Sequence, residues 1–298
     1  MSPPLRTYHH ADFPVDRLVE AKGNRTVSVC LPARNEAATV GGVVGAIARH
    51  LRDGFHLVDE LLVLDDGSTD GTLERAAAAG ARVMAAGDVF PELGDGAGKG
   101  DAMWKSLAVS CGDLVVWCDA DIRNFGPHFV TGLLGPLLLD ESLAFVKGFY
   151  ERPAHGRRGE GGRVTELVAR PLLCHLFPHL SGFAQPLAGE YAGRRDLLEQ
   201  LPFVRGYGVD LALLVDVAGA AGVHAMAQVD LGERVHRNRP LDELSLQAME
   251  ILQTALQRAG IPRRPGWSST LTQPGRDPVD VIVRERPPLA HARLDVGA

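Results

Sequence analysis

The sequence predicts an α/β fold with a mostly parallel central sheet flanked by helices. Between residues 27 and 146, short apolar runs alternate with helix-like stretches, which is the pattern of a parallel sheet covered by helices. The chain has 298 residues, 45% of them hydrophobic and 23% charged, so it can bury a large core. We expect one large domain, or two closely joined ones, without a membrane span.

Five apolar runs are predicted to be strands of this sheet: residues 27–31, 60–64, 81–85, 114–118 and 143–147. The intervening periodic stretches predict helices over residues 37–51, 69–79 and 101–110. Thr69 or Asp70 is a suitable N-terminal cap for the second of these helices. Because ligands bind beyond the carboxyl ends of strands in such sheets, the loops after the strands are the expected site.

The second half of the chain has a different composition. Residues 151–162 are rich in Gly, Arg and Pro and predict a mobile loop, and residues 164–175 predict a helix. Residues 241–258 read as a final amphipathic helix. From residue 261 the chain lacks periodicity, which predicts an arm or a disordered tail, and residues 1–24 are expected to be an N-terminal extension.

Charge and cysteine content restrict the class of protein. The net charge of -6 and the pI near 6.0 argue against a nucleic-acid binder, which needs clustered Lys and Arg. Any phosphate site must therefore be local. The four cysteines show no C-x-x-C spacing, and Cys30 and Cys118 lie within apolar strands. Buried thiols in a reducing compartment fit this pattern, so we expect a cytoplasmic protein.

The run from Asp113 to Asp121 ends in two carboxylates, Asp119 and Asp121, separated by Ala120. Side chains at i and i+2 of an extended segment point to the same side, so both carboxylates can lie together where the strand ends. Oxygen ligands shared with substrate phosphates suit Mg²⁺ or Mn²⁺, which suggests a nucleotide diphosphate held through a metal. Solvated acids or helix caps are the simpler explanation of an isolated pair.

Two further loops follow strands. The first carries Pro32 and three polar side chains, Arg34, Asn35 and Glu36, which suit a base or ribose, although an ordinary connection capped by Asn35 explains it equally well. The second, residues 64–72, is dense in acids and hydroxyls. Capping alone could account for three of them, namely Ser68, Thr69 and Asp70.

A glycine-rich loop precedes the third predicted helix. It is not a Walker-type phosphate loop, because Gly100 follows Lys99 where Ser or Thr is needed, and Leu93 stands where the leading glycine should be. It is not a dinucleotide fingerprint either, because Lys99 occupies the third glycine position. Lys99 could neutralise a diphosphate, or it could be a solvated surface lysine.

Gly161 and Gly162 lead into the helix predicted from residue 164. The free backbone N–H groups at a helix start, together with Arg163 and Thr165, would suit a small phosphorylated acid. A glycine hinge before a core helix, with Arg163 solvated, is the alternative.

The three strand-end loops together resemble those of the GT-A nucleotide-sugar glycosyltransferases. Four later segments resemble the actinobacterial glucosyl-3-phosphoglycerate synthases: residues 161–171, 185–191, 206–210 and 236–240. The likeness spans about residues 20–260. It implies a homodimeric GT-A enzyme that uses Mg²⁺ or Mn²⁺ to transfer glucose from UDP-glucose to the 2-hydroxyl of 3-phosphoglycerate with retention. Residues 25–150 would be its nucleotide-sugar half, residues 151–260 its acceptor half, and residues 261–298 an arm.

The resemblance also implies roles for individual residues. Asp121 and His236 would bind the metal, although His236 considered alone would be a surface residue among Arg234, Arg237 and Arg239. The acceptor would contact Gly162, Arg163, Val164, Thr165 and Asn238. The donor would contact Pro32, Ala33, Arg34, Asn35, Glu36, Asp66, Lys99, Asp119, Ala120, Tyr207, Gly208, Val209 and Asp210. Position 210 more often holds Glu in the family, so the contact of the shorter Asp210 with glucose is an open point.

The expected reaction is displacement at the anomeric carbon, with the metal and Lys99 offsetting charge on the departing UDP. No enzymic nucleophile is evident. Inversion would need a carboxylate base, for which Asp210 or Glu190 would serve, so retention rests on the resemblance. Front-face attack assisted by the leaving phosphate would then apply, with the backbone near Leu187 orienting the acceptor.

Other functions remain open. GDP-mannose could replace UDP-glucose, and a polyprenyl phosphate could be the acceptor, although the missing membrane segment disfavours it. A sugar-nucleotide binding module without turnover is a third possibility. A nucleotidyltransferase is disfavoured, because its first loop would begin with glycines.

Overall fold

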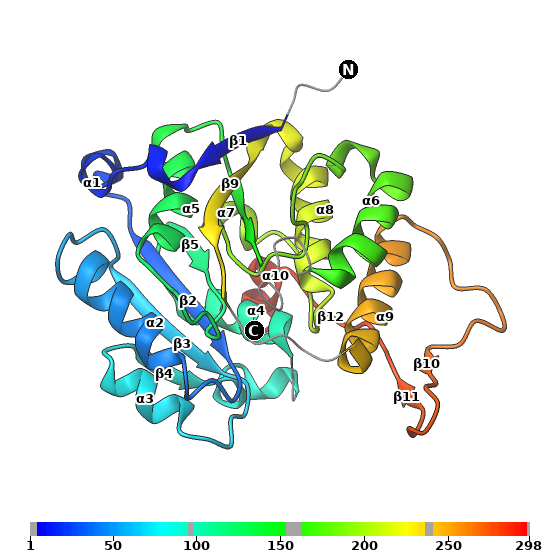
Figure 1. Cartoon of the computed structure of the whole chain (residues 1–298). Coiled ribbons are helices and arrows are strands. Elements are labelled where there is room, and N and C mark those ends of the chain that lie inside the picture. The colour runs from blue at the N-terminus through cyan, green and yellow to red at the C-terminus, as the bar shows by residue number, and fades with distance from the viewer. Residues whose placement is uncertain (1–4, 95–97, 153–161, 236–240, 297–298) are drawn as a thin grey trace.

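Eight strands form one sheet at the centre of the protein, and helices pack on both of its faces (Figure 1). A computed structural model describes residues 5–94, 98–152, 162–235 and 241–296. The sheet has the order β1-β9-β6-β7-β5-β2-β3-β4. Only β7 runs antiparallel to its neighbours, and the other pairs within this sheet are parallel. The predicted α/β class with a mostly parallel sheet is confirmed.

The five predicted strands are all present. They are β2 (Val27–Ala33), β3 (Glu60–Asp65), β4 (Arg82–Ala85), β5 (Leu114–Trp117) and β6 (Phe145–Glu151). The sheet is completed by β1 (Arg6–His9), β7 (Tyr191–Arg194) and β9 (Met226–Glu233). These strands are apolar on both faces because both faces are covered: Val29 and Leu31 belong to one core cluster, and Cys30 between them belongs to the other.

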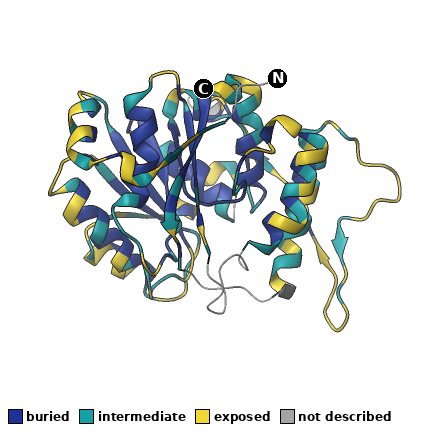
Figure 2. Cartoon of the chain, turned by 45° about the horizontal axis from the view of Figure 1, so that its top comes forward, coloured by how far each residue is buried: buried dark blue, intermediate teal, exposed yellow. Residues whose placement is uncertain are grey.

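Each face of the sheet has its own helices. The first core is closed by α1 (Val15–Lys22), α2 (Val40–Ile47), α3 (Thr72–Ala78) and α5 (His128–Leu139). The second is closed by α4 (Lys99–Val109), α6 (Arg170–Leu176), α8 (Val209–Ala221), α9 (Leu241–Arg258) and α10 (Leu289–Val296), with the short α7 (Arg195–Leu198). Figure 2 shows the sheet buried and the outer side of α9 exposed.

The sequence predicted the starts of the helices less well than it predicted the strands. The helix expected over residues 37–51 begins at Val40 and continues as a π-helical stretch, Ala48–Arg52. The helix expected over 164–175 consists of a π-helical stretch, Thr165–Ala169, followed by α6. π-helical turns leave no distinct sequence pattern, because the apolar spacing changes by only one residue.

Both ends of the chain contain structure that the sequence did not predict. β1 pairs in parallel with β9 at the sheet edge, so part of the segment 1–24 belongs to the sheet. The segment after residue 261, predicted to be an arm or a disordered tail, contains regular elements, so the disordered alternative is wrong for its described residues. β10 (Thr270–Leu271) pairs with β11 (Val279–Asp280), β12 (Glu285–Arg286) pairs with β8 (Phe203–Val204), and α10 buries Leu289 and Ala292.

Three expectations concern other parts of the chain. Cys30 and Cys118 are buried, as predicted, and all four cysteines are free. None of the helices in the described residues is long and apolar enough to cross a membrane. The loop expected to be mobile, and the site residues His236 and Asn238, fall largely or wholly outside the described residues.

Candidate active site

The loops predicted to form a site meet at one edge of the sheet. β2, β3, β5, β6 and β9 are parallel, so their carboxyl ends lie together, and the antiparallel β7 begins at the same edge (Figure 1). Trp117, the last residue of β5, is in register with Tyr191, the first residue of β7. The chain therefore brings side chains that are far apart in sequence to a single place.

Asp119 and Asp121 both contact one guanidinium at this edge. Arg234 Nη2 donates to Asp119 Oδ2 at 2.8 Å and to Asp121 Oδ1 at 2.7 Å. The two aspartates lie in the turn after β5 and not within an extended strand, so the i, i+2 argument is not what brings them together. The two carboxylates nevertheless lie together, because both accept from Arg234 Nη2.

Lys99 links this pair to a distant helix. Its Nζ lies 3.1 Å from Asp119 Oδ1 and 3.2 Å from Asp210 Oδ1. Burial would lower the pKa of Lys99, but Asp119, Asp210 and Glu190 together outweigh burial and raise it. Burial would likewise raise the pKa of Asp119, but Lys99 and Arg234 lower it below its usual range. Lys99 is therefore a fixed cation and not a solvated surface lysine.

Asp210 is buried in the first turn of α8. Besides Lys99, its Oδ1 accepts a hydrogen bond from the Tyr191 hydroxyl at 3.2 Å. Lys147, a buried lysine on β6, donates to the backbone oxygen of Asp210 at 3.4 Å and lies 4.3 Å from the centre of the Tyr191 ring. Burial lowers the pKa of Lys147 to about 8, although Asp210 opposes that shift.

A second buried cluster lies behind the aspartate pair. Glu190 is fully buried directly before β7, with Oε1 3.5 Å from Arg234 Nε. Burial raises the pKa of Glu190, and Arg234 opposes it. The Tyr150 hydroxyl accepts from Arg234 Nη1 at 2.9 Å and from Arg152 Nη2 at 2.7 Å. These contacts fix the orientation of Arg234.

The two loops after β2 and β3 are joined by hydrogen bonds. Asn35 adopts a left-handed backbone with φ 58°, and its Oδ1 accepts from the Thr69 N–H at 2.8 Å. The Ser68 hydroxyl accepts from the Asn35 N–H at 2.9 Å, and Asp70 Oδ2 accepts from Ala37 N–H at 3.2 Å. Ser68, Thr69 and Asp70 thus fasten the neighbouring loop, and Asp70 Oδ1 also accepts from the N–H of Thr72, the first residue of α3, at 3.0 Å.

Asp66 connects these loops to the start of α4. Its Oδ2 accepts from the Gly98 N–H at 2.9 Å and lies 3.6 Å from Arg34 Nη1. Burial raises the pKa of Asp66, and the Gly98 N–H opposes the shift. Pro32 and Ala33 belong to the end of β2, and Ala33 is buried. Arg34 is the cation of this loop, and its side chain is largely exposed. Of the predicted donor residues, Asp66 therefore contacts the residue that precedes Lys99, and Arg34 lies beside Asp66.

The segment before α8 is held by Glu250 of α9. Glu250 Oε2 accepts from the Tyr207 N–H at 2.6 Å, and Glu250 also accepts from the Gly208 N–H. A Cβ on Gly208 would lie 2.2 Å from Thr254 Oγ1, so only glycine fits there. Val209 is buried at the start of α8. The segment from Tyr207 to Asp210 is thus held in place and ends beside Lys99.

The loop that contains Leu187 passes directly beneath Asp119. A Cβ on Gly189 would lie 2.3 Å from Asp119 Oδ2, so the backbone approaches the carboxylate too closely for any other residue. Leu187 itself is buried, as is Ala120 between the aspartates. The side chain of Leu187 therefore packs in the core, and only its backbone is left for an acceptor.

The predicted acceptor segment begins with Gly162, which has a positive φ of 78°. The helix starts at Arg163, one residue before the predicted start, and the Glu166 N–H donates to the Gly162 carbonyl at 3.0 Å. Val164 and Thr165 are buried, and Val164 belongs to the second core. Contacts of Val164 with an acceptor would therefore involve its backbone.

Known proteins match the sequence and the fold of this chain. The model of Glycosyl transferase family 2 matches residues 28–163. A glucosyl-3-phosphoglycerate synthase of Mycobacterium tuberculosis (strain CDC 1551 / Oshkosh) is 50% identical over 263 residues, which cover 86% of this chain and 80% of the relative. The synthase of Petrotoga mobilis is 45% identical over 260 residues, covering 85% and 80%. The chain belongs to the glucosyl-3-phosphoglycerate synthase family.

A solved structure supports the same assignment. The crystal structure of the Mycobacterium tuberculosis synthase in complex with Mn²⁺, UDP-glucose and phosphoglyceric acid superimposes with a TM-score of 0.89 at 47% identity. The match covers 98% of this chain and 100% of the other. Another crystal structure of that synthase contains Mg²⁺ and UDP. The GT-A type of fold predicted from the sequence is confirmed for this member of the family.

The aspartate pair of this glucosyl-3-phosphoglycerate synthase family member suits a divalent ion. Two carboxylate oxygens already converge on one positive group, Arg234 Nη2, and carboxylates are the ligands that Mg²⁺ and Mn²⁺ prefer. Within the described residues, no group of three or more His, Cys, Asp or Glu side chains forms a metal site. His236, the predicted third ligand, lies outside them.

The sequence did not identify several residues of this site. Arg234 was expected at the surface, yet it is buried because β9 ends directly behind the aspartate pair. Lys147 was placed in a strand without a role. A lysine within an otherwise apolar strand could have indicated a buried, paired charge, because lysine is rarely buried without a partner. Tyr191 and Glu250 gave no such signal, because their partners come from distant segments.

Proposed function

We propose that this chain transfers glucose from UDP-glucose to the 2-hydroxyl of 3-phosphoglycerate with retention of the anomeric configuration, giving glucosyl-3-phosphoglycerate and UDP. The observation that carries the proposal is Lys99, held between Asp119 and Asp210 at 3.1 and 3.2 Å. Membership of a family whose members are named for this product supports the substrates. A structure of the tuberculosis synthase with UDP, Mn²⁺ and glucosyl-3-phosphoglycerate supports the product.

The fixed positive charge of Lys99 fits a role at the departing diphosphate. When the bond between the anomeric carbon and the phosphate oxygen breaks, negative charge grows on UDP, and a buried cation nearby stabilises that charge. Lys99 emerges from the first turn of α4, whose N-terminus adds a partial positive charge. Lys99 would therefore exchange part of its pairing with Asp119 for the diphosphate.

Asp121, with Asp119 beside it and His236 from outside the described residues, would hold Mg²⁺ or Mn²⁺. Bound there, the ion supplies a Lewis acid that offsets the charge of the leaving diphosphate. Arg234 would keep both carboxylates oriented toward the ion, because it is itself held by Tyr150 and Glu190. The structures of the tuberculosis synthase that contain Mn²⁺ or Mg²⁺ support this assignment.

Retention is supported by the environment of the two carboxylates that could serve as a base. Asp210 is paired with Lys99 and Tyr191, and Glu190 is fully buried beside Arg234. Neither presents a free carboxylate to an acceptor hydroxyl. We propose that the 2-hydroxyl attacks the anomeric carbon from the face that UDP leaves, and that its proton passes to the departing phosphate oxygen.

For the acceptor, we propose that Gly162 and Arg163 bind the phosphate of 3-phosphoglycerate. Gly162 has the left-handed backbone that turns the chain into the helix, and the first N–H groups of that helix carry partial positive charge. Thr165 and Asn238 would complete the acceptor site. The backbone near Leu187 would orient the hydroxyl, since this loop contacts Asp119 through Gly189.

We further propose that the chain acts in the cytoplasm as a homodimer. Four free cysteines fit a reducing compartment. Exposed apolar side chains on α9 and the C-terminal hairpin fit a subunit contact, namely Leu246, Leu252, Trp267, Val279 and Ile282. Light scattering during gel filtration would give the mass, and a monomer across the concentration range would contradict the dimer.

Nucleotide release tests the proposed reaction. The purified protein is incubated with Mg²⁺ or Mn²⁺, one donor and one acceptor, and UDP or GDP is measured. We expect release with UDP-glucose and 3-phosphoglycerate, and little with GDP-mannose or with glycerate, which lacks the phosphate. Release with GDP-mannose alone would make the protein a mannosyl transferase, and no release with either donor would leave only a binding module.

A further inference from the structure

The C-terminal segment is built into the donor side of the site. β12 pairs antiparallel with β8, and the Arg205 N–H extends this pairing by donating to the Arg284 carbonyl at 2.9 Å. Arg205 directly precedes the segment Gly206–Asp210 that ends beside Lys99. Residues from the far end of the chain therefore form the backbone partner of the donor segment.

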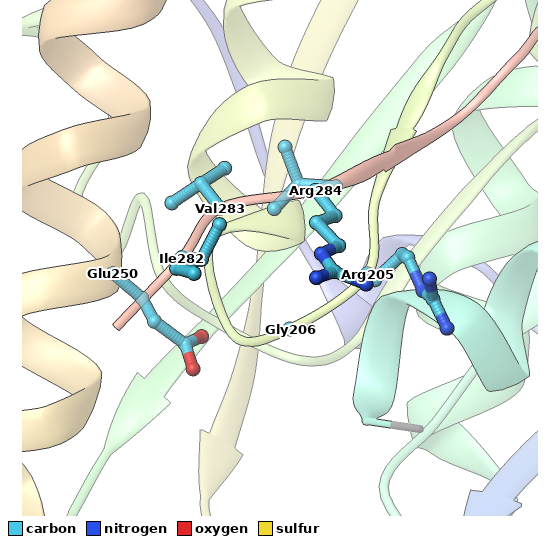
Figure 3. Close-up of a pocket in the computed structure, with 7 residues that line it drawn as sticks. Arg205, Gly206, Glu250, Ile282, Val283 and Arg284 are labelled. Carbon is cyan, nitrogen blue, oxygen red and sulfur yellow. The ribbon is translucent and has the colours of Figure 1, made fainter. Parts of the chain in front are cut away.

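Figure 3 shows the seam between this segment and α9. Glu250 reaches from α9 toward Gly206, and Arg205 points away from it toward α4. A cavity of about 270 Å³ lies along the seam, and it is lined by Val204, Arg205, Gly206, Glu250, Ile282, Val283 and Arg284. The open side of the seam is thus at residues 282–284, whereas the next residues of the chain turn inward.

Arg286 is the residue that turns inward. It is only 4% exposed, and all three of its guanidinium nitrogens donate hydrogen bonds. Nε donates to Asp101 Oδ1 at 2.6 Å, Nη1 to the Leu93 carbonyl at 2.7 Å, and Nη2 to the Gly94 carbonyl at 3.0 Å. The planar fork of arginine matches these three acceptors, which no other side chain can do.

The contacts of Arg286 fix the start of α4. Asp101 lies two residues after Lys99 in the first turn of that helix, and Leu93 and Gly94 lie at the other end of the loop before it. The Asp101 N–H donates to the Arg205 carbonyl at 2.9 Å, and its carboxylate is 3.5 Å from Arg205 Nε. Arg286 therefore links Leu93 and Gly94 to the helix start and, through Asp101, to the donor segment.

Trp104 of α4 also contacts the C-terminal segment, at Arg286 and Pro287. Its indole N–H donates to the Pro287 carbonyl at 2.8 Å, and the Arg286 guanidinium lies 5.5 Å from the centre of its ring. Gly100 allows the close approach, because a Cβ there would lie 1.7 Å from the Val204 carbonyl oxygen. The first turn of α4 is thus packed closely against β8.

We propose that Arg286 is a positioning residue for Lys99, so that the C-terminal segment is a part of the catalytic unit that sets how the donor diphosphate is bound. The inference rests on the proposed function for the identity of the donor. Arg286 touches neither Lys99 nor a substrate group, and it acts through Asp101 and the carbonyls of Leu93 and Gly94. Loss of the guanidinium leaves those carbonyls without this donor, so the turn that bears Lys99 shifts.

The test compares two arginines at opposite ends of the same helix. Arg195 donates to the Leu107 carbonyl at 2.8 Å and the Gly112 carbonyl at 2.6 Å, at the end of α4 remote from Lys99. Arg286→Gln and Arg195→Gln each remove one guanidinium from backbone carbonyls of the α4 region. Thermal unfolding, KM for UDP-glucose, KM for 3-phosphoglycerate and the Kd of UDP in Mn²⁺ by calorimetry are measured for both.

For Arg286→Gln we expect KM for UDP-glucose and the Kd of UDP to rise about tenfold or more, with KM for 3-phosphoglycerate changed by less than about threefold. Arg195→Gln should lower the unfolding temperature similarly and leave both donor constants unchanged. Arg286→Lys, which keeps the charge but not the fork, should fall between wild type and Arg286→Gln and serves if the glutamine variant does not fold.

Two results would overturn the inference. One is donor constants that stay unchanged in both Arg286 variants, and the other is an equal rise in Arg195→Gln. The Kd of UDP separates this inference from the proposed function. If the wild type bound UDP but transferred no glucose, the proposed reaction would fail, while the effect of Arg286 on UDP binding would still decide the inference.

Discussion

Lys99 Nζ and Asp210 Oδ1 lie 3.2 Å apart, although 111 residues separate them in the chain. The pair joins the first turn of α4 to the first turn of α8 at the carboxyl edge of the sheet. Both side chains are largely buried, so the ion pair is held by the fold and not by solvent-exposed contact. The positions of these two charges are therefore set before any substrate binds.

The metal assignment predicts that Asp121→Asn loses most of its activity. Losing one charged ligand should lower kcat/KM by roughly 100-fold or more, which corresponds to about 2.7 kcal/mol of transition-state stabilisation. Binding of Mn²⁺, followed by electron paramagnetic resonance in the presence of UDP, should weaken in parallel. Asp113→Asn, which removes a carboxylate at the opposite end of β5, is the control. Full transfer activity in Asp121→Asn would rule out Asp121 as a ligand.

Because Gly189 lies so close to Asp119, adding one methyl group at position 189 should lower the activity. In Gly189→Ala the new Cβ would meet Asp119 Oδ2 at 2.3 Å, so either the loop or the carboxylate must move. We expect kcat/KM to fall by about tenfold to 100-fold. Gly219→Ala on α8, where a Cβ meets nothing within 4 Å, should be active and slightly stabilised. Equal activity of the two variants would contradict the described geometry.

Lys147 predicts a pH-dependent stability. Its pKa is about 8 in the folded protein, against an ordinary value of 10.5, so the unfolded chain binds more protons between these values. Stability of the wild type should therefore rise as pH increases from about 8 to about 10. At pH 7, Lys147→Met should be more stable by about 1–3 kcal/mol, because a buried charge is removed, and this gain should shrink above pH 8.

Urea unfolding at pH 7, 8, 9 and 9.5 measures this effect. Gln228→Met, a neutral change at the position in register with Lys147 on β9, should keep the pH dependence of the wild type. A gain in Lys147→Met that stayed constant across the four pH values would show that Lys147 does not titrate in this range.

Glu250 predicts an effect on donor binding from α9. Its carboxylate accepts from the Tyr207 N–H at 2.6 Å at the start of α8. Glu250→Ala leaves that N–H without its partner and should raise KM for UDP-glucose by about tenfold, because loss of a hydrogen bond to a charged group is worth about 1.5 kcal/mol. Glu250→Gln, which keeps an acceptor oxygen, should change it less. Steady-state kinetics measures KM for each variant. Glu243→Ala, which changes an exposed residue of the same helix, is the control and should keep the KM of the wild type.

The sequence predicts the sheet well and the charge cluster only in part. Apolar runs such as Val27–Ala33 show a two-sided buried strand directly, and Asp119 and Asp121 were found because they end such a run. Arg234 and Glu190 could not be placed, because each is buried only through partners that tertiary folding brings to it. Arg286 fell within the segment expected to be an arm or a disordered tail for the same reason, because its burial depends on partners far away in the sequence.

Product analysis tests the central claim most directly. The protein is incubated with Mn²⁺, UDP-glucose and 3-phosphoglycerate, and the product is examined by proton and carbon NMR. We expect one glucosyl group, linked to the oxygen on carbon 2 of 3-phosphoglycerate, with the small anomeric coupling of an α-glucoside. A β-linked product would contradict retention, and release of free glucose without a glycosidic product would contradict transfer to 3-phosphoglycerate.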